Sequence, residues 1–263
     1  MLRWGRRLLL LAALALLAGT VTACSASAPR TYLLHVPSCK SPCAARPLVI
    51  VLHGVASTAA QAETSTNFDH YADLDHFVVA YPQGLPTSVT ATSNFTDGAW
   101  NAGAASGPLQ CCAAATSDDL SWLAALPKAI NARTHIDLKR VYVAGFSNGG
   151  MMAFKAVCSR PDVFAAAEVV SGALLVPCSK TVVHVLHAHD LVNDCFVPYA
   201  GGYTCGGKPT PFIPADFPDS ANESKMVAPG SVVKFVAIDT GHEWPTATGA
   251  QMGWNFLRQW RLR

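Results

Sequence analysis

The sequence is poor in charge, lacks a long apolar run and lacks the usual spacing of zinc ligands. Charged residues make up 14% of 263 residues, and no basic stripe with interleaved aromatic residues is present, so nucleic-acid binding is not favoured. The leading apolar run, Leu8–Ala18, is too short to span a bilayer, which needs about 20 residues. No pair of cysteines shows a C-x-x-C spacing, and we find no internal repeat.

The first 23 residues have the layout of a secretory signal peptide. Arg3, Arg6 and Arg7 precede the apolar run, and small residues follow it, as in a charged region, an apolar core and a cleavage site. No acidic residue lies in this segment, so the rest of the chain has 16 basic and 17 acidic residues and a formal charge of −1 instead of +2. The basic balance of the whole sequence is therefore mostly a property of this segment.

The stretch Val21–Cys24 resembles the bacterial lipoprotein cleavage signal, in which a small residue precedes a cysteine that receives lipid and becomes the new N-terminus. We predict a lipoprotein-type signal peptide at 1–23, lipid attachment at Cys24, a short linker at 24–30 and one domain at 31–263. The alternative is ordinary secretion after cleavage nearby. In both cases we expect an exported bacterial protein, either anchored to the membrane through the lipid on Cys24 or secreted.

Eight cysteines remain besides Cys24, an even number in a chain that we expect to be exported. An oxidising compartment favours disulfides over zinc ligation for such a set. Short loops make Cys39–Cys43 and Cys195–Cys205 the least costly pairs, although the spacing alone leaves the connectivity open. The eight cysteines are Cys39, Cys43, Cys111, Cys112, Cys158, Cys178, Cys195 and Cys205.

Strand-like and helix-like segments alternate along residues 31–263. Short apolar runs rich in β-branched residues predict strands, and amphipathic or alanine-rich segments predict helices. The alternation favours an α/β fold in a single domain, with a mostly parallel central sheet and helices on both faces. The predicted strands are 31–37, 47–53, 77–81, 140–144, 165–170, 182–186 and 232–238, and the predicted helices are 58–75, one that begins at Ser117, 149–158 and 250–260.

Three features interrupt this alternation. Residues 84–116 are rich in Gly, Ser, Thr and Ala without a clear period, which predicts a long loop of the kind that often carries function. Residues 201–230 are rich in Pro and Gly and predict a lid-like insertion, held by cysteines, rather than a second domain. Pro127 is expected to kink or shorten the helix that begins at Ser117.

A candidate nucleophile lies where a predicted strand meets a predicted helix. The stretch Gly145–Gly149 reads GFSNG and matches the G-x-S-x-G motif in the strand-to-helix context that this motif requires. A sharp turn there exposes the hydroxyl of Ser147 and leaves no room for side chains two residues to either side. A chance glycine-rich turn is the alternative, and the flanking strand and helix make it less favoured.

A serine hydroxyl needs a base, and the base needs an orienting carboxylate. With this motif the partners follow the serine in the order acid, then histidine. His242 stands alone in a loop between the last strand and the last helix, so we predict it as the general base. The acid should follow the strand 182–186, where Asp190 and Asp194 are available.

Several stretches together resemble the polyhydroxybutyrate depolymerase and feruloyl esterase group of α/β-hydrolases. The resemblance extends over nearly all of residues 31–260 and implies an α/β-hydrolase fold, an ester substrate and no cofactor or metal. The stretches that carry it are LVIVLHG, GAWNAG with CC and DDLSWL, VYVAGFSNGGMMAF followed by RPDVFAAAEVVSGAL, and VPYAGG with GHEWP.

The family pattern H-G-x-x-D-x-x-V-P-Y also bears on the choice of the acid. Counting back from Pro198 selects Asp194, whereas counting forward from His187 gives Leu191, next to Asp190. The chain carries about three extra residues here, and Ala188 stands where the family has glycine. We favour Asp194 because the V-P-Y side of the pattern is intact, and Asp190 is the alternative.

The oxyanion formed during acyl transfer needs two hydrogen-bond donors. We predict the backbone N–H of Asn148, which follows the nucleophile, and that of Val55, in the loop after the strand 47–53. Trp100 and Trp244 are candidates to line an acyl or aromatic pocket, although plain packing explains each equally well.

Three functions are compatible with these residues. The first is a serine carboxylic ester hydrolase, built on Ser147, Asp194 and His242, that acts on feruloyl, hydroxyalkanoate or short-chain acyl esters. The second is a non-catalytic binding lipoprotein with a hydrolase fold. The third is a metal-dependent hydrolase that uses His184, His187 and His189 with Asp190. The oligomeric state is not indicated by the sequence.

Overall fold

The computed structural model describes residues 30–39, 43–90, 93–103, 117–197, 199 and 227–263. The predicted signal peptide, Cys24 and nearly all of the linker lie outside the described residues, as do Cys111, Cys112, Cys205 and most of the predicted insertion at 201–230. Within the described part of the chain, no helix combines the length and the apolar character needed to cross a membrane.

The centre of the fold is a seven-stranded sheet with the strand order β1-β3-β2-β6-β7-β8-β9. β1 runs antiparallel to β3 at one edge, and all other neighbouring strands pair in parallel. The mostly parallel sheet predicted from the sequence is therefore confirmed. Its strands are β1 (Tyr32–His35), β2 (Arg46–Leu52), β3 (Val78–Pro82), β6 (Ile136–Phe146), β7 (Ala166–Val170), β8 (His184–Asp190) and β9 (Val232–Ile238).

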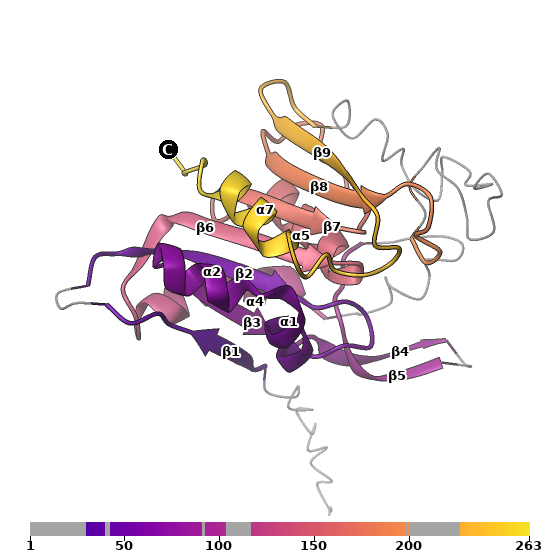
Figure 1. Cartoon of the computed structure of the whole chain (residues 1–263), viewed down its shortest axis with the longest axis horizontal. Coiled ribbons are helices and arrows are strands. Elements are labelled where there is room, and N and C mark those ends of the chain that lie inside the picture. The colour runs from indigo at the N-terminus through magenta and orange to yellow at the C-terminus, as the bar shows by residue number, and fades with distance from the viewer. Residues whose placement is uncertain (1–29, 40–42, 91–92, 104–116, 198, 200–226) are drawn as a thin grey trace, which may run out of the picture.

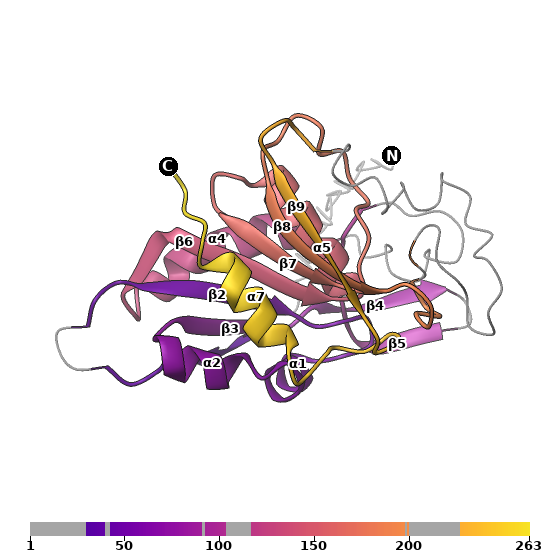
Figure 2. The same cartoon turned by 45° about the horizontal axis from the view of Figure 1, so that its top comes forward.

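Helices cover both faces of the sheet (Figures 1 and 2). α4 (Asp119–Asn131) and α5 (Asn148–Ser159) lie on one face, and α1 (Ala59–Thr66), α2 (Phe68–Asp75) and α7 (Gly249–Leu257) lie on the other. Each face buries its own apolar cluster. Because successive residues of a strand point to opposite faces, a strand that contributes to both clusters must be apolar throughout.

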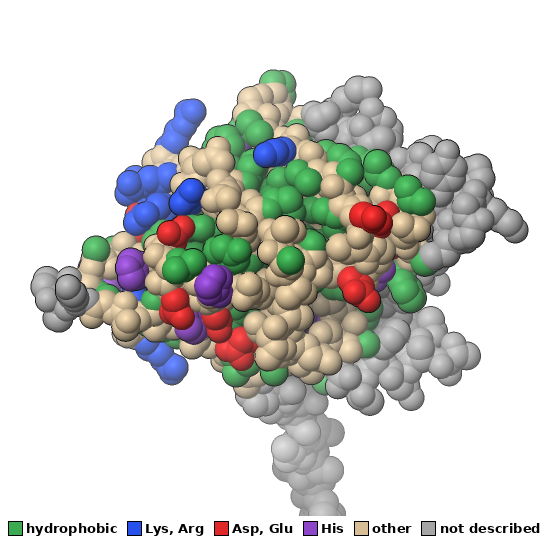
Figure 3. Space-filling view, in the orientation of Figure 1, with side chains coloured by type: hydrophobic (Ala, Val, Ile, Leu, Met, Phe, Trp, Pro, Cys, Tyr) green, Lys and Arg blue, Asp and Glu red, His purple; other side chains and the backbone are tan. Residues whose placement is uncertain are grey.

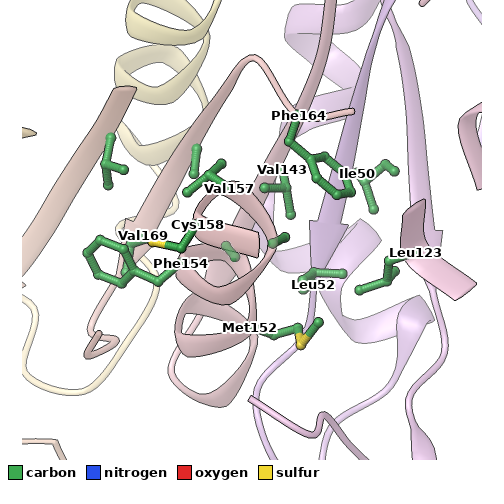
Figure 4. Packing of buried hydrophobic residues seen from close by; sticks show 14 of the residues in the cluster. Ile50, Leu52, Leu123, Val143, Met152, Phe154, Val157, Cys158, Phe164 and Val169 are labelled. Carbon is green, nitrogen blue, oxygen red and sulfur yellow. The ribbon is translucent and has the colours of Figure 1, made fainter. Parts of the chain in front are cut away.

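β2 shows how one strand serves both clusters. Leu48, Ile50 and Leu52 belong to the cluster under α4 and α5, whereas Val49 and Val51 belong to the cluster under α1, α2 and α7. All five side chains are at most 1% exposed, and each contributes about 1.5–3 kcal/mol to folding. Figure 4 shows part of the first cluster, with side chains of α5 packed against those of the neighbouring strands.

The predicted helix 58–75 is divided into two helices. Asn67 ends α1 and precedes α2 with φ 62°, a left-handed conformation that asparagine tolerates better than most residues. Thr58 caps α1 in a reciprocal pair with Gln61, which satisfies amide groups that the first turn leaves without helical partners. The direction of the chain changes at Asn67, so the uninterrupted helix was a wrong prediction.

Two other predictions fail for reasons of tertiary packing. Part of the predicted loop 84–116 forms a β-hairpin, because β4 (Leu85–Thr90) and β5 (Ser93–Ala99) pair antiparallel, and backbone pairing needs no apolar period. α4 continues through Pro127 to Asn131, so the proline does not shorten this helix. Leu126 and Ile130 are buried on either side of the proline, and this packing outweighs the hydrogen bond that proline cannot donate.

β8 is longer than its apolar pattern predicts. It continues beyond Leu186 to Asp190 and pairs with β9 along its whole length. His187 and His189 are therefore interior residues of a strand, and both are at most 1% exposed. A hydrophobic pattern does not identify buried polar residues as strand, so the sequence predicted the end of this strand too early.

The cysteines in the described part of the chain form disulfides, as expected. Cys39–Cys43 is present as predicted, and Cys158 at the end of α5 is bonded to Cys178, a pair that the spacing had left open. Cys195 is also disulfide-bonded, while its predicted partner Cys205 lies outside the described residues. These bonds fit a protein that folds in an oxidising compartment.

The described surface carries both signs of charge. On the face shown in Figure 3, Lys and Arg side chains gather mainly near the C-terminus, acidic and His side chains lie around α2, and further acidic side chains lie apart on the right of the view. His35 of β1 contacts α2, with Nε2 2.8 Å from Asp73 Oδ1 and Nδ1 3.4 Å from Asp69 Oδ2. Pairs on a surface of this kind contribute about 0–1 kcal/mol each, so they adjust the stability of the fold only slightly.

Glu168, in the middle of β7, is a fully buried acid. The side chain is 0% exposed, and neither carboxyl oxygen has a hydrogen-bond partner among the described residues. α7 passes so close that a Cβ added at Gly253 would lie 1.8 Å from Glu168 Oε2. Burial raises the pKa of Glu168 well above its usual range, so the folded protein keeps this proton at pH values where the unfolded chain has released it.

We expect Glu168→Gln to flatten the dependence of stability on pH. The unfolded chain loses the Glu168 proton above about pH 4.3, while the folded chain keeps it. Stability is thus fully present below that pH and falls by about 1.4 kcal/mol per pH unit up to the folded pKa. Thermal unfolding between about pH 4 and 9 should show similar melting temperatures for the two proteins near pH 4 and a growing excess for the variant as the pH rises above about 4.3. Parallel curves for both proteins would contradict this, and Glu63→Gln on α1 is the matched control.

Candidate active site

Ser147 lies in a strained turn between β6 and α5. Its backbone has φ 53° and ψ −121°, which a side-chain-bearing residue adopts only when the surroundings enforce it. A Cβ added at Gly145 would lie 2.2 Å from Gly149 O, and one added at Gly149 would lie 2.3 Å from Leu52 O. Only glycine fits at both positions, which is the physical reason for the G-x-S-x-G spacing.

His242 connects this serine to a carboxylate from another loop. Its Nε2 is 2.9 Å from Ser147 Oγ, and its Nδ1 is 2.9 and 3.0 Å from the two oxygens of Asp194. A carboxylate only accepts hydrogen bonds, so Nδ1 carries the proton and Nε2 is left to accept from the serine hydroxyl. The three groups follow β6, β8 and β9, so the parallel sheet brings them to one edge.

The carboxylate of Asp194 is held in place by backbone amides. Val197 N and Phe196 N donate to Oδ1 at 2.8 and 3.1 Å, and the side chain is 0% exposed. Burial by itself raises the pKa of Asp194, but hydrogen bonds from His189 and His242 outweigh it and hold the pKa well below its usual range. The acid therefore stays ionised at neutral pH.

Asp190, the alternative acid, lies beside this group and contacts other partners. Its Oδ1 accepts from Val192 N and Asn193 N at 2.8 Å each, and its Oδ2 accepts from Gly241 N at 2.8 Å. It thus ties the loop that leads to Asp194 to the residue before the candidate base. The structure brings Asp194, and not Asp190, to the imidazole.

The two predicted oxyanion residues also lie next to Ser147. Asn148 is the first residue of α5, and its buried side chain accepts from Trp100 N at 2.7 Å and donates to Trp100 O at 3.1 Å. Val55 lines the same cavity as the serine, and a Cβ added at Gly54 would lie 3.5 Å from Ser147 Cβ. The N-terminus of a helix favours negative charge, which suits an oxyanion at this point.

Sequence reasoning missed the residues that hold the loop around Val55. His53 Nε2 accepts from Gly84 N at 2.9 Å, so its Nδ1 carries the proton and donates to Gly54 O at 2.7 Å. Trp100 Nε1 donates to His53 O at 2.9 Å. Trp100 is fully buried and acts in packing instead of lining the pocket. The histidine directly after the buried strand was the available signal for this network.

A cavity of about 730 Å³ opens beside Ser147 and His242. Phe146 and Phe196 flank the imidazole, with ring centroids 4.9 and 5.2 Å away, and Phe196 is 73% exposed. Apolar groups thus surround the candidate nucleophile, as in most small-molecule sites. The described lining is Gly54, Val55, Ala56, Ser57, Ser65, Phe146, Ser147, Cys195, Phe196, Val197, His242, Glu243, Trp244 and Thr246.

The histidines of the metal hypothesis do not converge. His187 and His189 point to one face of the sheet, while His184 lies three residues before His187, on the opposite face, and stacks on the Trp260 ring at 3.6 Å. Among the described residues, no group of three His, Cys, Asp or Glu side chains is placed to hold a metal ion. The structure therefore does not support the metal-dependent alternative.

Comparison with known protein families agrees with this geometry. Residues 30–190 match the family described as esterase PHB depolymerase. The chain belongs to this family. The match includes the turn at Ser147 and ends at Asp190, so Asp194 and His242 lie beyond it.

Curated relatives of this PHB depolymerase family member carry esterase names. Feruloyl esterase B of Piromyces equi is 29% identical over 262 residues, which cover 89% of this chain and 46% of that protein. The putative esterase NocK of Nocardia uniformis subsp. tsuyamanensis is 30% identical over 149 residues, which cover 56% of this chain and 39% of that protein. The chain thus spans less than half the length of these relatives.

Solved structures confirm the α/β-hydrolase fold. The native crystal structure of pOPH superposes with a TM-score of 0.60 at 17% identity, covering 84% of this chain and 79% of that one. SOBER1 of Arabidopsis thaliana superposes with a TM-score of 0.55 at 16% identity, covering 82% of this chain and 99% of that one. At this level of identity the likeness concerns the fold alone.

Proposed function

We propose that this protein is a serine carboxylic ester hydrolase whose triad is Ser147, His242 and Asp194. The observation that carries the proposal is the continuous hydrogen-bond chain from the serine hydroxyl through the imidazole to a buried, ionised carboxylate. Membership of an esterase family supports the same reaction class.

The geometry suits acyl transfer in two steps. Ser147 Oγ attacks the ester carbonyl carbon while His242 Nε2 takes the hydroxyl proton, and the resulting oxyanion is bound by the N–H groups of Asn148 and Val55. The intermediate collapses as the imidazolium gives its proton to the departing alcohol, leaving an acyl-serine. A water molecule then attacks with the same imidazole as base, and the carboxylic acid leaves as Ser147 regains its proton.

Asp194 supports this chemistry electrostatically. Its negative charge stabilises the imidazolium that forms in both steps and fixes the Nδ1–H tautomer of His242. The carboxylate is buried, so water screens this interaction little. The low pKa of Asp194 keeps this charge in place throughout the neutral pH range.

The side chains that line the cavity favour the binding of apolar or aromatic acyl groups. Phe146, Phe196 and Trp244 provide ring faces beside the nucleophile, and Ser57 and Thr246 add polar groups. We propose feruloyl, hydroxyalkanoate or short-chain acyl esters as substrates, in agreement with the feruloyl esterase names of several relatives. A panel of methyl ferulate, acetyl xylan, p-nitrophenyl esters and hydroxybutyrate oligomers separates these classes.

We also propose that the protein is exported. The disulfides Cys39–Cys43 and Cys158–Cys178 support an oxidising compartment. Lipid attachment at Cys24 and a membrane anchor stay predictions from the leader sequence.

A fluorophosphonate probe tests the reaction class directly. We expect it to label Ser147 covalently, because the probe captures a hydroxyl that a neighbouring base activates. We also expect a chelator to leave hydrolysis of p-nitrophenyl butyrate unchanged. Activity lost with the chelator would favour a metal-dependent hydrolase, whereas neither labelling nor hydrolysis would favour the non-catalytic binding protein.

A further inference from the structure

A second histidine contacts the candidate acid from within the sheet. His189 of β8 is 1% exposed, and its Nε2 lies 3.2 Å from Asp194 Oδ2 and 2.5 Å from Val197 O. The carboxylate of Asp194 therefore contacts two imidazoles, that of His242 in the loop after β9 and that of His189 in β8. The proposed mechanism assigns no role to the second one.

The surrounding acceptors determine which nitrogen of His189 carries the proton. A carboxylate and a carbonyl oxygen only accept, so Nε2 is a donor, and its single N–H is shared between Val197 O at 2.5 Å and Asp194 Oδ2 at 3.2 Å. Burial lowers the pKa of His189, so the ring is neutral near pH 7 and its Nδ1 is an acceptor. His187 Nε2 lies 3.0 Å from that Nδ1 and must therefore donate to it. A directional chain thus runs from His187 through His189 to Val197 O and Asp194 Oδ2.

Aromatic rings enclose this pair of histidines. His187 is 0% exposed and has the rings of Phe154 and Phe235 at 5.5 and 5.8 Å. Tyr199 lies 5.4 Å from the His189 ring. The titratable groups that face His189 among the described residues are Asp194, His187 and Tyr199. Such packing limits the rotation of both rings and keeps the donor aimed at the carboxylate.

We propose that His189 is a positioning residue for Asp194, and that His187 fixes the tautomer in which His189 donates to it. Backbone amides donate to Oδ1 of the carboxylate, and the N–H of His189, shared with Val197 O, contacts Oδ2 at 3.2 Å. With both oxygens restrained, the carboxylate keeps the orientation in which it meets His242 Nδ1 at 2.9 and 3.0 Å. This inference rests on the proposed function, because it assigns a role within the same triad.

Two amide substitutions of equal polarity test the donor. In His189→Gln the side-chain nitrogen reaches the position of Nε2, so kcat should stay within about fivefold of wild type. In His189→Asn the amide ends near the position of Nδ1 and loses Asp194, so kcat should fall by about 10–100-fold, as for the loss of a hydrogen bond to a charged group. KM should stay within about twofold in both, because His189 does not line the cavity. Similar kcat values for the two variants would overturn the proposal.

His184→Asn is the matched control, since it makes the same change on the same strand away from the triad. Ser147→Ala, assayed in parallel, separates the two proposals. Activity retained in Ser147→Ala would remove the proposed function. Activity lost in Ser147→Ala, together with wild-type kcat in His189→Asn, would remove only the role of His189.

Imidazole ¹⁵N spectra of the wild-type protein give an answer even if a variant fails to fold. We expect His189 to carry its proton on Nε2 near pH 7, and a proton on Nδ1 instead would overturn the proposal.

Discussion

Replacing Ser147 with alanine is expected to lower kcat for p-nitrophenyl butyrate by about 10⁵- to 10⁶-fold, as for the removal of the nucleophile from a complete triad. The residual rate should reflect only substrate binding and the oxyanion donors. The melting temperature should change little, because the substitution removes one oxygen from a side chain that fits the turn unchanged. Steady-state kinetics and thermal unfolding measure the two quantities.

Ser121→Ala on the exposed surface of α4 is the control for this experiment, since it makes the same chemical change away from the cavity. A Ser147→Ala variant that keeps even a tenth of wild-type turnover would remove Ser147 from the mechanism. Loss of turnover accompanied by unfolding would instead show that the strained turn depends on the hydroxyl.

Asp194→Asn is expected to lower kcat by about 10⁴-fold, as when the orienting carboxylate of a triad is neutralised. The amide can present N–H to His242 Nδ1, which favours the tautomer with its proton on Nε2 and leaves that nitrogen unable to accept from Ser147. The charge that stabilises the imidazolium is lost as well. Steady-state kinetics on the folded variant give this number.

Asp190→Asn distinguishes the two candidate acids. Asp190 accepts from three backbone amides and does not contact the imidazole, so we expect a lower melting temperature and a kcat within about tenfold of wild type. If Asp190→Asn abolished turnover while Asp194→Asn remained active, the assignment of the acid would be reversed.

Much of the fold follows from patterns that are local in the sequence. The fully apolar run of β2 and the regular alternation of strands and helices are enough to predict a parallel sheet covered on both faces. The predictions that failed concern segments whose structure depends on distant partners. Asn67 divides α1 from α2, Gly84 and Gly98 meet at the open end of the β4–β5 hairpin, and α4 tolerates Pro127 because its neighbours are buried.

The residues of the candidate site also fall into two groups, those that a local sequence pattern indicates and those that only the fold brings together. The sequence indicated Ser147 through a motif that has a steric cause. It indicated His242 through the fixed order in which the acid and the histidine follow that motif. The sequence favoured Asp194 over Asp190 only through the V-P-Y side of a family pattern, since both follow the same strand and the fold of their loop decides which carboxylate turns toward the imidazole. His53 is marked only by its place directly after a buried strand, and His189 carries no local pattern that marks its hydrogen bonds.

The sequence by itself determined the steric features of this protein: where glycine must flank a serine, which strands are buried on both faces, and the order of the three polar groups along the chain. The tertiary structure alone decided which groups meet, because Ser147 and Asp194 are joined only through His242 in the described part of the chain. A hydrogen bond forms only when the donor–acceptor distance is right to within a few tenths of an ångström. Between segments that are distant in the sequence, only the packed sheet sets this distance.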